Sequence, residues 1–162
     1  MITARNAHSV VLCADQIYVI GGFSGKEWLN TVEKYNEENK TWKNVASMKH
    51  KRHYLAACAF NGENCSIYVF GGFFGGSDAE INDTIEKYDP DNNVWNSLAL
   101  KLKSPLWACT AVPLQNNQIA ILGGKNKNWN SEVFVLDTEE MKWGQIPSMN
   151  QAWVSHKAFF IK

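Results

Sequence analysis

The chain has 162 residues, with 16 lysines and arginines balanced by 16 aspartates and glutamates, so its formal net charge is zero. It has neither the basic stripe that binds nucleic acid nor the polybasic segment that favours a membrane surface, which argues against both kinds of partner. There is no apolar run of membrane length, and we expect no signal peptide, because residues 1–5 lead directly into the first repeated unit. With 45% hydrophobic and 12% aromatic residues, the chain can bury a core. We expect the protein to be located in the cytoplasm.

The first unit of the chain predicts four short antiparallel strands. Its second strand ends at a glycine pair, Gly21 and Gly22, and its third strand ends at Tyr35. Seven residues later Trp42 marks the fourth strand, and the polar turn formers between the two aromatic residues suit a hairpin connection. The strands expected in this unit are residues 9–14, 16–20, 31–35 and a strand around Trp42.

Two further units repeat this order. Glycine pairs recur at 71–72 and 123–124, at intervals of 50 and 52 residues, and each closes a run of β-forming residues. Tyr88 and Leu136 take the place of Tyr35, and a tryptophan follows each of them after seven residues. A repeat near 50 residues is found in very few architectures. The strands expected here are 55–60, 66–70, 84–88 and a strand around Trp95, then 108–114, 118–122, 133–136 and a strand around Trp143.

The repeat is less regular at two positions. A methionine follows the first and third of these tryptophans after six residues, at Met48 and Met149, while the middle unit has Lys101 at that spacing. The third unit also lacks the arginine that precedes the inner strand in the first two units, Arg5 and Arg52. We therefore expect the second and third units to depart locally from the first.

An arginine before the first strand, a glycine pair, and a tyrosine and a tryptophan at fixed separation together resemble the Kelch repeat. The resemblance covers essentially the whole chain and is closest to the branch in which Kelch repeats follow a BTB domain. It implies an all-β fold in which each repeat forms one blade of a β-propeller. We expect a partial Kelch-type propeller over residues 1–162, with three four-stranded antiparallel blades plus the first strand of a fourth. The repeats are expected at about 5–51, 52–103 and 104–151, and the start of the fourth at 152–162, with its strand at 156–161.

The number of blades leaves two explanations open. Closed propellers have roughly four to eight blades, so three blades would turn through only part of a circle. The chain is then either part of a larger propeller or a molecule that self-associates through open blade edges. Uncovered sheet faces and an unpaired inner strand are expected to recruit other chains.

No arrangement of residues in the sequence indicates catalysis. His8 and His156 stand at equivalent positions of the repeat, which favours a structural role, and His50 and His53 have no catalytic partners in sequence. The glycine-rich run 71–76 is explained by strand and turn chemistry rather than by nucleotide binding. We expect no catalytic residue, no metal site and no cofactor. The cysteines lack CxxC spacing and are interpreted as small core residues of a protein in a reducing compartment: Cys13, Cys58, Cys65 and Cys109.

The Kelch resemblance implies a docking surface for a protein or peptide at one mouth of the propeller channel. In that family the partner commonly contacts the residue after each glycine pair and the residues around the arginine. An acidic or phosphorylated peptide would be favoured near Arg5 and Arg52, because guanidinium groups pair well with such groups. Trp153 takes the arginine position at the start of the fourth repeat. The matching positions of this chain are Arg5, Asn6, Phe23, Arg52, His53, Phe73, Trp107 and Lys125.

A structural role is the alternative for the same residues. Phe73 and Trp107 would then pack between blades, and the two arginines would pair with acidic residues of neighbouring loops. The family resemblance implies a non-enzymatic protein–protein interaction module, the substrate-recognition part of a Kelch adaptor of a cullin-RING ubiquitin ligase. An actin-binding or general scaffold Kelch protein is the alternative, and an oxidoreductase built on a Kelch-like propeller is a remote one.

Overall fold

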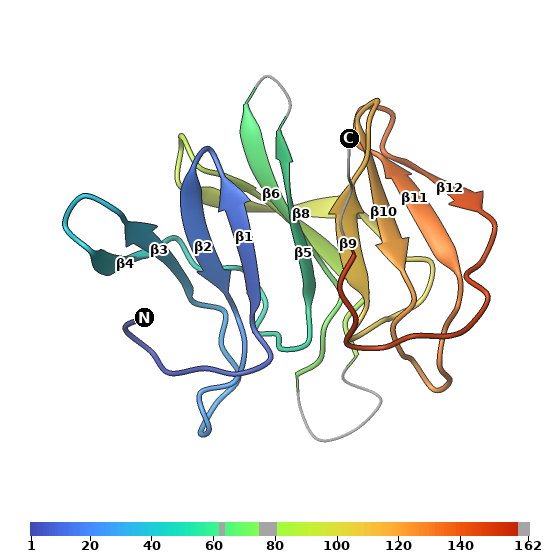
Figure 1. The fold of residues 1–162 in the computed structure, drawn as a ribbon, viewed down its shortest axis with the longest axis horizontal. Coiled ribbons are helices and arrows are strands. Elements are labelled where there is room, and N and C mark those ends of the chain that lie inside the picture. The colour runs from blue at the N-terminus through green and yellow to red at the C-terminus, as the bar shows by residue number, and fades with distance from the viewer. Residues whose placement is uncertain (62–63, 75–80, 159–162) are drawn as a thin grey trace.

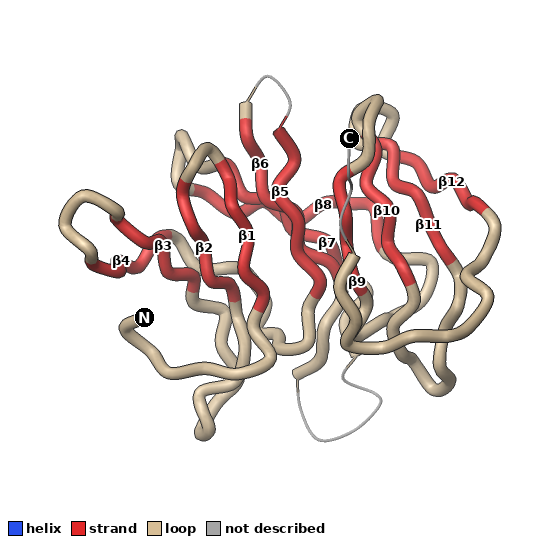
Figure 2. The backbone as a smooth tube through the Cα atoms, in the orientation of Figure 1, coloured by secondary structure: helices blue, strands red, loops and turns tan. Residues whose placement is uncertain are grey.

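The structure of the protein is a computed structural model that describes residues 1–61, 64–74 and 81–158. Within these ranges the chain is all-β and contains no helix, as Figure 2 shows. No helix of the described residues is long and apolar enough to cross a membrane. The expected all-β fold class is confirmed.

In the described part of the chain, twelve strands form three four-stranded antiparallel sheets, in each of which the strands are hydrogen-bonded in chain order. Blade 1 contains β1 (Ser9–Cys13), β2 (Gln16–Ile20), β3 (Val32–Asn36) and β4 (Thr41–Val45). Blade 2 contains β5 (Ala56–Asn61), β6 (Cys65–Phe70), β7 (Thr84–Asp89) and β8 (Val94–Lys101). Blade 3 contains β9 (Thr110–Pro113), β10 (Gln118–Leu122), β11 (Val133–Asp137) and β12 (Lys142–Ile146).

The blades are arranged as in part of a propeller. The inner strands β1, β5 and β9 contact one another in that order, while β4 and β12 lie at the outer sides of the molecule (Figure 1). The expected three blades of a partial propeller are therefore present. The turn from β1 to β2 and the turn from β9 to β10 lie at the same end of the molecule, at the top of Figure 1.

The tyrosine and tryptophan spacing of the repeat is a register signal. Tyr35 lies directly opposite Trp42 on the neighbouring strand, and Tyr88 lies opposite Trp95 in the same way. The third pair is formed by Leu136 and Trp143. A fixed separation of seven residues therefore gives the same cross-strand pair in each blade, and such pairs stabilise sheets through side-chain packing.

Blade 2 differs from its neighbours by a β-bulge between Thr84 and Glu86, where the register with β8 shifts. The shift places Leu102, rather than Lys101, at the position of Met48: the Leu102 amide donates to the Asp83 carbonyl at 2.9 Å, as the Met48 amide does to the Asn30 carbonyl at 2.9 Å. Leu102 is buried like Met48. The assignment of Lys101 to this position from the sequence is wrong, because the register shift makes Leu102, seven residues after Trp95 instead of six, the equivalent of Met48, and spacing alone does not reveal this.

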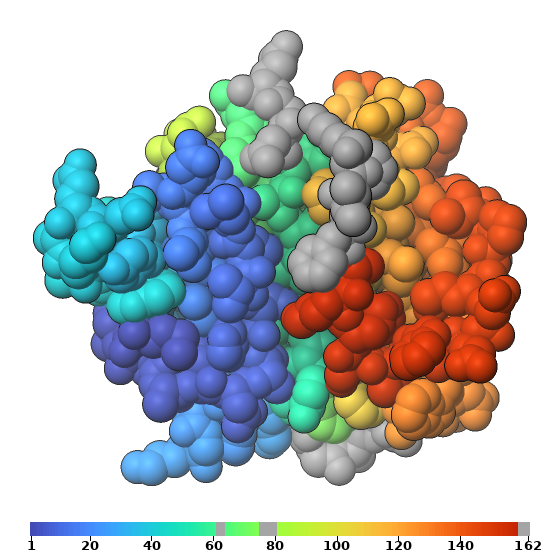
Figure 3. All heavy atoms as spheres, viewed as in Figure 1, coloured from blue at the N-terminus to red at the C-terminus, as the bar shows by residue number. Residues whose placement is uncertain are grey.

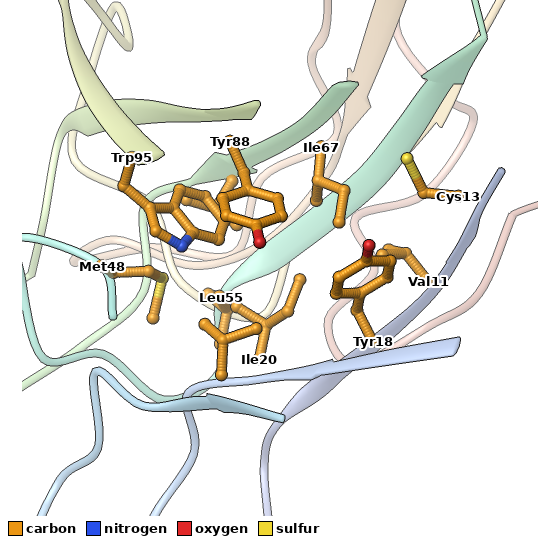
Figure 4. Packing of buried hydrophobic residues seen from close by; sticks show 11 residues of the cluster. Val11, Cys13, Tyr18, Ile20, Met48, Leu55, Ile67, Tyr88 and Trp95 are labelled. Carbon is orange, nitrogen blue, oxygen red and sulfur yellow. The ribbon is translucent and has the colours of Figure 1, made fainter. Parts of the chain in front are cut away.

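Blades 1 and 2 pack face to face through an apolar core (Figure 4). Tyr18 of β2 meets Tyr88 of β7 edge to face, with ring centroids 5.8 Å apart. Met48 and Leu55 from the connection between the blades fill the space beside Trp95. Offset aromatic pairs of this kind add to the area they bury.

The tryptophans of blades 2 and 3 join each blade to the preceding one. Trp95 donates its indole N–H to the carbonyl of Ala46 at 2.9 Å, and Trp143 donates to the carbonyl of Lys101 at 2.7 Å. Trp95 is 1% exposed, whereas Trp143 and Trp42 are half-buried. The equivalent tryptophans of the three repeats are therefore not equally buried. Among the described residues, no earlier blade covers Trp42.

The first glycine of each pair lies where the next blade approaches most closely. Gly71 has a φ of +57°, and a Cβ added there would lie 2.2 Å from the carbonyl oxygen of Leu106. The amide of the following Gly72 donates to that same carbonyl at 2.8 Å. Glycine is required because the backbone is left-handed and because no side-chain atom fits.

The expectation that all four cysteines are unbonded core residues needs correction. Cys13 and Cys65 form a disulfide that joins blade 1 to blade 2, while Cys58 and Cys109 are buried thiols. The two bonded residues are 52 positions apart and lie on facing sheets, so their proximity depends on the packing of the blades. Nothing in their sequence spacing indicates it.

The start of the fourth repeat lies against blade 3, where Figure 3 shows it as a red segment beside the orange blade. The Ser155 amide donates to the Ala108 carbonyl at 2.9 Å, and the Thr110 hydroxyl donates to the His156 carbonyl at 2.7 Å. No strand is assigned in residues 152–158. The expected strand at 156–161 extends into residues 159–162, which lie outside the described residues.

Candidate functional site

Six of the eight predicted docking residues pair with one another at the same edge of the three blades. Asn6 bridges Phe23, and both backbone hydrogen bonds of the pair measure 3.0 Å. His53 bridges Phe73 at 3.0 and 2.8 Å. The third bridge joins Trp107 and Lys125 at 3.0 and 2.8 Å. The residue after each glycine pair is thus fixed to the residue after the arginine position.

A chain of backbone hydrogen bonds ties these bridges together from blade to blade. The Tyr54 amide donates to the Ala7 carbonyl at 2.8 Å, and the Ala108 amide donates to the Tyr54 carbonyl at 2.8 Å. Ala7, Tyr54, Ala108 and Ser155 have φ values from 49° to 53°, which are uncommon for residues other than glycine. The left-handed residue at this position of each repeat accepts a hydrogen bond at its carbonyl from the amide of the equivalent residue in the next repeat. The three bridges therefore stand in a row.

The side chains of this row form a continuous aromatic surface. His53 is its centre: its ring centroid lies 6.4 Å from Phe23, 5.2 Å from Phe73 and 5.0 Å from Tyr54. Trp107 extends the row over blade 3, at 5.4 Å from Tyr54 and 6.1 Å from Phe73. At the other end Trp28 lies 6.0 Å from Phe23. We refer to the following as the aromatic surface: Phe23, Trp28, His53, Tyr54, Phe73 and Trp107.

These rings remain in contact with solvent. Tyr54 is 42% exposed, and the other five residues of the aromatic surface are half-buried. Lys125 borders the surface in blade 3, with its ammonium group 5.4 Å from the centroid of the Trp107 ring. A cation over an aromatic face is attracted by the ring quadrupole. The surface therefore ends in a positive charge at blade 3.

Arg5 and Arg52, in contrast, lie below this surface. The side chains of both arginines are 0% exposed, as are their partners Glu33 and Glu86. The Arg5 Nη2 lies 2.6 Å from the Glu33 Oε1, and the Arg52 Nη2 lies 2.8 Å from the Glu86 Oε1. The guanidinium groups are thus engaged within their own blades, which is the structural role that the sequence left open as the alternative.

Each buried arginine binds the loop that carries the docking residue. Arg52 Nη1 donates to the carbonyls of Gly71 at 2.7 Å and of Thr84 at 3.2 Å. In blade 1, Arg5 Nη1 donates to the Gly21 carbonyl at 2.9 Å. In each of these two blades, one guanidinium binds the carbonyl before the loop and the carbonyl after it, and the docking residue lies in that loop. The arginines therefore position Phe23 and Phe73.

The carboxylate of each pair also accepts backbone hydrogen bonds. Glu33 accepts from the amides of Ile2 at 2.6 Å and Thr3 at 3.0 Å. Burial alone would raise the pKa of Glu33, but the amides and Arg5 outweigh burial and hold that pKa below its ordinary value. Glu33 is therefore a carboxylate at neutral pH, and a buried ion pair is tolerated when its remaining hydrogen bonds are made.

Blade 3 lacks the ion pair at both positions. Leu106 stands where Arg52 stands in blade 2, and Phe134 stands where Glu86 stands. Both are buried, at 1% and 5% exposed. The loss of the arginine, which the sequence shows by itself, is accompanied by loss of the acid, so no unpaired charge is left inside the blade.

His53 connects the aromatic surface to the backbone. Its Nδ1 lies 2.6 Å from the Phe73 carbonyl, which can only accept, so this nitrogen carries the proton. Burial lowers the pKa of His53, and the hydrogen bond to Phe73 opposes that effect only in part. The ring is therefore neutral at pH 7 and adds no positive charge to the surface.

Two members of the aromatic surface were not predicted from the sequence. Trp28 bridges Phe23 from the far side of its loop, as Trp129 bridges Lys125. Tyr54 directly follows His53, and its left-handed φ turns its ring outwards. A tryptophan four or five residues after the bridging residue is the signal that would have indicated the first of these. Trp153, at the arginine position of the fourth repeat, is 51% exposed.

The described residues contain no group of three or more histidine, cysteine, aspartate or glutamate side chains placed to hold a metal ion. Burial raises the pKa of the Cys109 thiol to about 12 and that of Cys58 still higher, so neither is a thiolate at neutral pH. The feature of this site that can bind another molecule is the row of rings in the aromatic surface.

The chain resembles proteins with Kelch repeats over its whole length. The family model described as the KLHDC2/KLHL20/DRC7 Kelch-repeats domain matches residues 1–161. An F-box/kelch-repeat protein of Arabidopsis thaliana is 36% identical over 92 residues, which is 57% of this chain and 26% of that protein. Kelch-like protein 35 of Mus musculus is 31% identical over 159 residues, which is 94% of this chain and 25% of that protein.

An enzyme also appears among the relatives. The N-acetylneuraminate epimerase of Yersinia enterocolitica is 30% identical over 120 residues, which is 70% of this chain and 29% of that protein. The chain thus spans about a quarter of the length of each of these relatives.

Proposed function

Because the chain belongs to the Kelch-repeat family, we propose that it is a protein-interaction module which holds a segment of a partner protein on its aromatic surface. The observation that carries this proposal is the continuity of the rings across three blades, with neighbouring centroids 5.0 to 6.4 Å apart. Kelch repeats are mostly non-enzymatic interaction domains. Binding, rather than catalysis, is what this surface supports.

The composition of the surface suits hot-spot contacts. Tyrosine and tryptophan bury a large area for little loss of side-chain freedom, and they dominate the energetics of many interfaces. Tyr54 is the most exposed ring of the surface, at 42%. Its neighbours His53 and Trp107 are half-buried and held by backbone bridges, so little order needs to be gained on binding.

A preference for an acidic partner rests on Lys125. Arg5 and Arg52 are neutralised inside their blades, and for them we propose a positioning role rather than direct contact. Lys125 lies at the end of the surface over Trp107, where its ammonium group can meet a carboxylate of the partner. The partner segment then has apolar side chains over blades 1 and 2 and an acidic residue over blade 3.

For the whole protein we propose the role of a substrate-recognition subunit of a cullin-RING ubiquitin ligase acting in the cytoplasm. Support comes from the relatives, which include Kelch-like proteins, an F-box protein and a protein with a RING finger domain. An actin-binding or scaffold Kelch protein would use the same surface and is the second candidate. The epimerase relative keeps an enzymatic role as a remote third.

The test uses a partner identified by proximity labelling and then purified. Titration calorimetry would compare the chain with Tyr54→Ala and Lys125→Glu, and with Lys40→Glu in the β3–β4 turn as a matched charge control. We expect each of the first two to weaken binding at least tenfold and the control to leave it unchanged. Equal affinities for all four proteins would place the interface elsewhere and overturn the proposal.

A further inference from the structure

A covalent bond crosses the interface between blades 1 and 2. Cys13 is the last residue of β1 and Cys65 is the first residue of β6, and their sulfur atoms form a disulfide. Both residues lie at the same interface as the core of Tyr18, Tyr88 and Trp95. The bond therefore connects two blades that are otherwise held together by packing and hydrogen bonds.

The other two cysteines differ from this pair. Cys58 and Cys109 are buried on the opposite side of blade 2, in the core shared with blade 3. Burial raises the pKa of both thiols, and a protonated thiol is a poor nucleophile. Cys65, in contrast, is half-buried, while its bonded partner Cys13 is 0% exposed. Thiol exchange is thus confined to one pair, in which Cys65 is the more exposed residue.

The same interface also carries part of the aromatic surface. Phe23 and Trp28 belong to blade 1, and their rings lie 6.4 and 6.3 Å from the ring of His53, which begins blade 2. The backbone on this side is joined by the Gly22 amide, which donates to the Arg52 carbonyl at 2.9 Å. The disulfide and these rings therefore lie on the same interface, at opposite ends of the blades, and the packing between blades 1 and 2 connects them.

We propose that the Cys13–Cys65 disulfide is a reversible, redox-sensitive bond that sets the stability of the blade 1 and blade 2 interface, and through it the order of the aromatic surface. The effect on binding rests on the function proposed above, whereas the effect on stability does not. The reactant is a low-molecular-weight thiol such as glutathione.

The exchange proceeds in two balanced steps. A glutathione thiolate attacks the Cys65 sulfur, forms a mixed disulfide with it and expels Cys13 as a thiolate, which takes up a proton. A second glutathione thiolate attacks the glutathione sulfur of the mixed disulfide, releasing glutathione disulfide and the Cys65 thiolate. Two electrons pass from two glutathione molecules to the protein disulfide, and glutathione disulfide reverses the sequence.

The size of the effect follows from the loop that the bond closes. Cysteines 52 residues apart constrain a long segment of the unfolded chain, and such a constraint raises the thermal midpoint of a domain of this size by about 10 °C. The affinity of the partner is expected to change in the same direction, because an ordered surface loses less freedom on binding.

The experiment compares thermal unfolding of the wild-type chain after equilibration in glutathione disulfide and in reduced glutathione, with the bond state read by mass spectrometry after alkylation. We expect a midpoint about 10 °C higher in the oxidised sample. Cys65→Ser should unfold at the same temperature under both conditions. Cys58→Ala removes a thiol without touching the pair, so it should keep the full redox difference.

Three results would overturn the proposal: failure of the bond to form in glutathione disulfide, equal midpoints for the two wild-type samples, or a redox difference that persists in Cys65→Ser. The wild-type comparison needs no variant, so it stands even where a substitution impairs folding. Titration of the identified partner under both conditions is a separate readout. Loss of the binding difference alone would count against the link to the aromatic surface but not against the function proposed above.

Discussion

The Nη2 atom of Arg52 lies 2.8 Å from the Oε1 atom of Glu86, with both side chains 0% exposed. The pair lies directly beneath the loop of Phe73, since the same guanidinium binds the Gly71 carbonyl at 2.7 Å. Arg52, which the sequence predicts as an exposed docking residue, thus supports the aromatic surface from below. Substitution of Arg52 should therefore lower the stability of the fold.

Arg52→Ala should lower the free energy of unfolding by about 3–5 kcal/mol, because it leaves the Glu86 carboxylate buried without its partner. Urea denaturation followed by tryptophan fluorescence measures this change. The control is the double variant Arg52→Leu with Glu86→Phe, which copies Leu106 and Phe134 of blade 3 and should recover most of the loss. Normal stability of Arg52→Ala would mean that the ion pair contributes nothing.

Trp95 and Trp42 should differ although they occupy the same position of the repeat. Trp95 is 1% exposed and donates to the Ala46 carbonyl, so Trp95→Ala should cost about 3–5 kcal/mol. Trp42 is half-buried in blade 1, and its replacement by alanine should cost clearly less. The two variants are compared by urea denaturation under one set of conditions. Equal losses would contradict the assignment of Trp95 to an inter-blade core.

Gly71→Ala should be among the most damaging small substitutions. The added Cβ would lie 2.2 Å from the Leu106 carbonyl oxygen, and the residue's φ of +57° is strained for alanine. Gly144→Ala is the matched control, because the nearest atom to its Cβ, the Val135 carbonyl oxygen, is 3.8 Å away. Circular dichroism and the thermal midpoint should show loss of structure in the first variant alone.

The sequence predicts those features that depend on neighbours in the chain. The separation of Tyr88 and Trp95 gives the register of their hairpin, and the glycine pairs mark the sites of close approach. Features that depend on packing between distant segments are not predicted. The disulfide of Cys13 with Cys65 is an example, because only the packing of two blades brings these residues together.

For the docking surface, too, the sequence predicts some features and not others. Positions such as Phe73 and Lys125 follow from motif phase, and the structure places them in equivalent bridges. The burial of Arg52 does not follow from motif phase, because the sequence cannot distinguish an exposed arginine from one that is buried beside an acid 34 residues away. The spacing of residues in the sequence also does not reveal the bulge that puts Leu102, instead of Lys101, at the position equivalent to Met48.

Stability should fall as the pH is lowered through the histidine range. Burial, together with the positive charge of Arg5, lowers the pKa of His8 in the folded state, and the buried Nδ1 of its ring has no hydrogen-bond partner among the described residues. Below the ordinary pKa of 6.5 the unfolded chain therefore binds protons that the folded chain does not, so the free energy of unfolding decreases there. Well above pH 6.5 both states are neutral and the effect vanishes.

Urea denaturation between pH 7.5 and pH 5 measures this slope, and His8→Gln should make it shallower because glutamine does not titrate in that range. His53 should contribute to the remaining slope, because burial lowers its pKa as well. A stability that is constant over this interval would show that neither ring is kept neutral by folding.

The outer face of blade 1 should make the isolated chain self-associate. Val10, Leu12 and Ile17 lie on this face and are 56%, 60% and 38% exposed. The corresponding face of blade 2, with Ile67 at 0% exposed, is packed against blade 1. Because no blade among the described residues covers the face of blade 1, it remains an apolar surface that recruits another chain.

We predict a dimer in which two sets of three blades approximate a six-bladed ring, or larger aggregates, at rising protein concentration. Sedimentation velocity over a hundredfold concentration range should show the association. Leu12→Lys should shift the chain towards monomer, because it places a charge in the centre of the face. Val94→Lys is the control, since Val94 is 37% exposed on β8, away from this face, and should leave the association unchanged. A wild-type monomer at every concentration that binds no hydrophobic dye would show that the exposed face needs no partner.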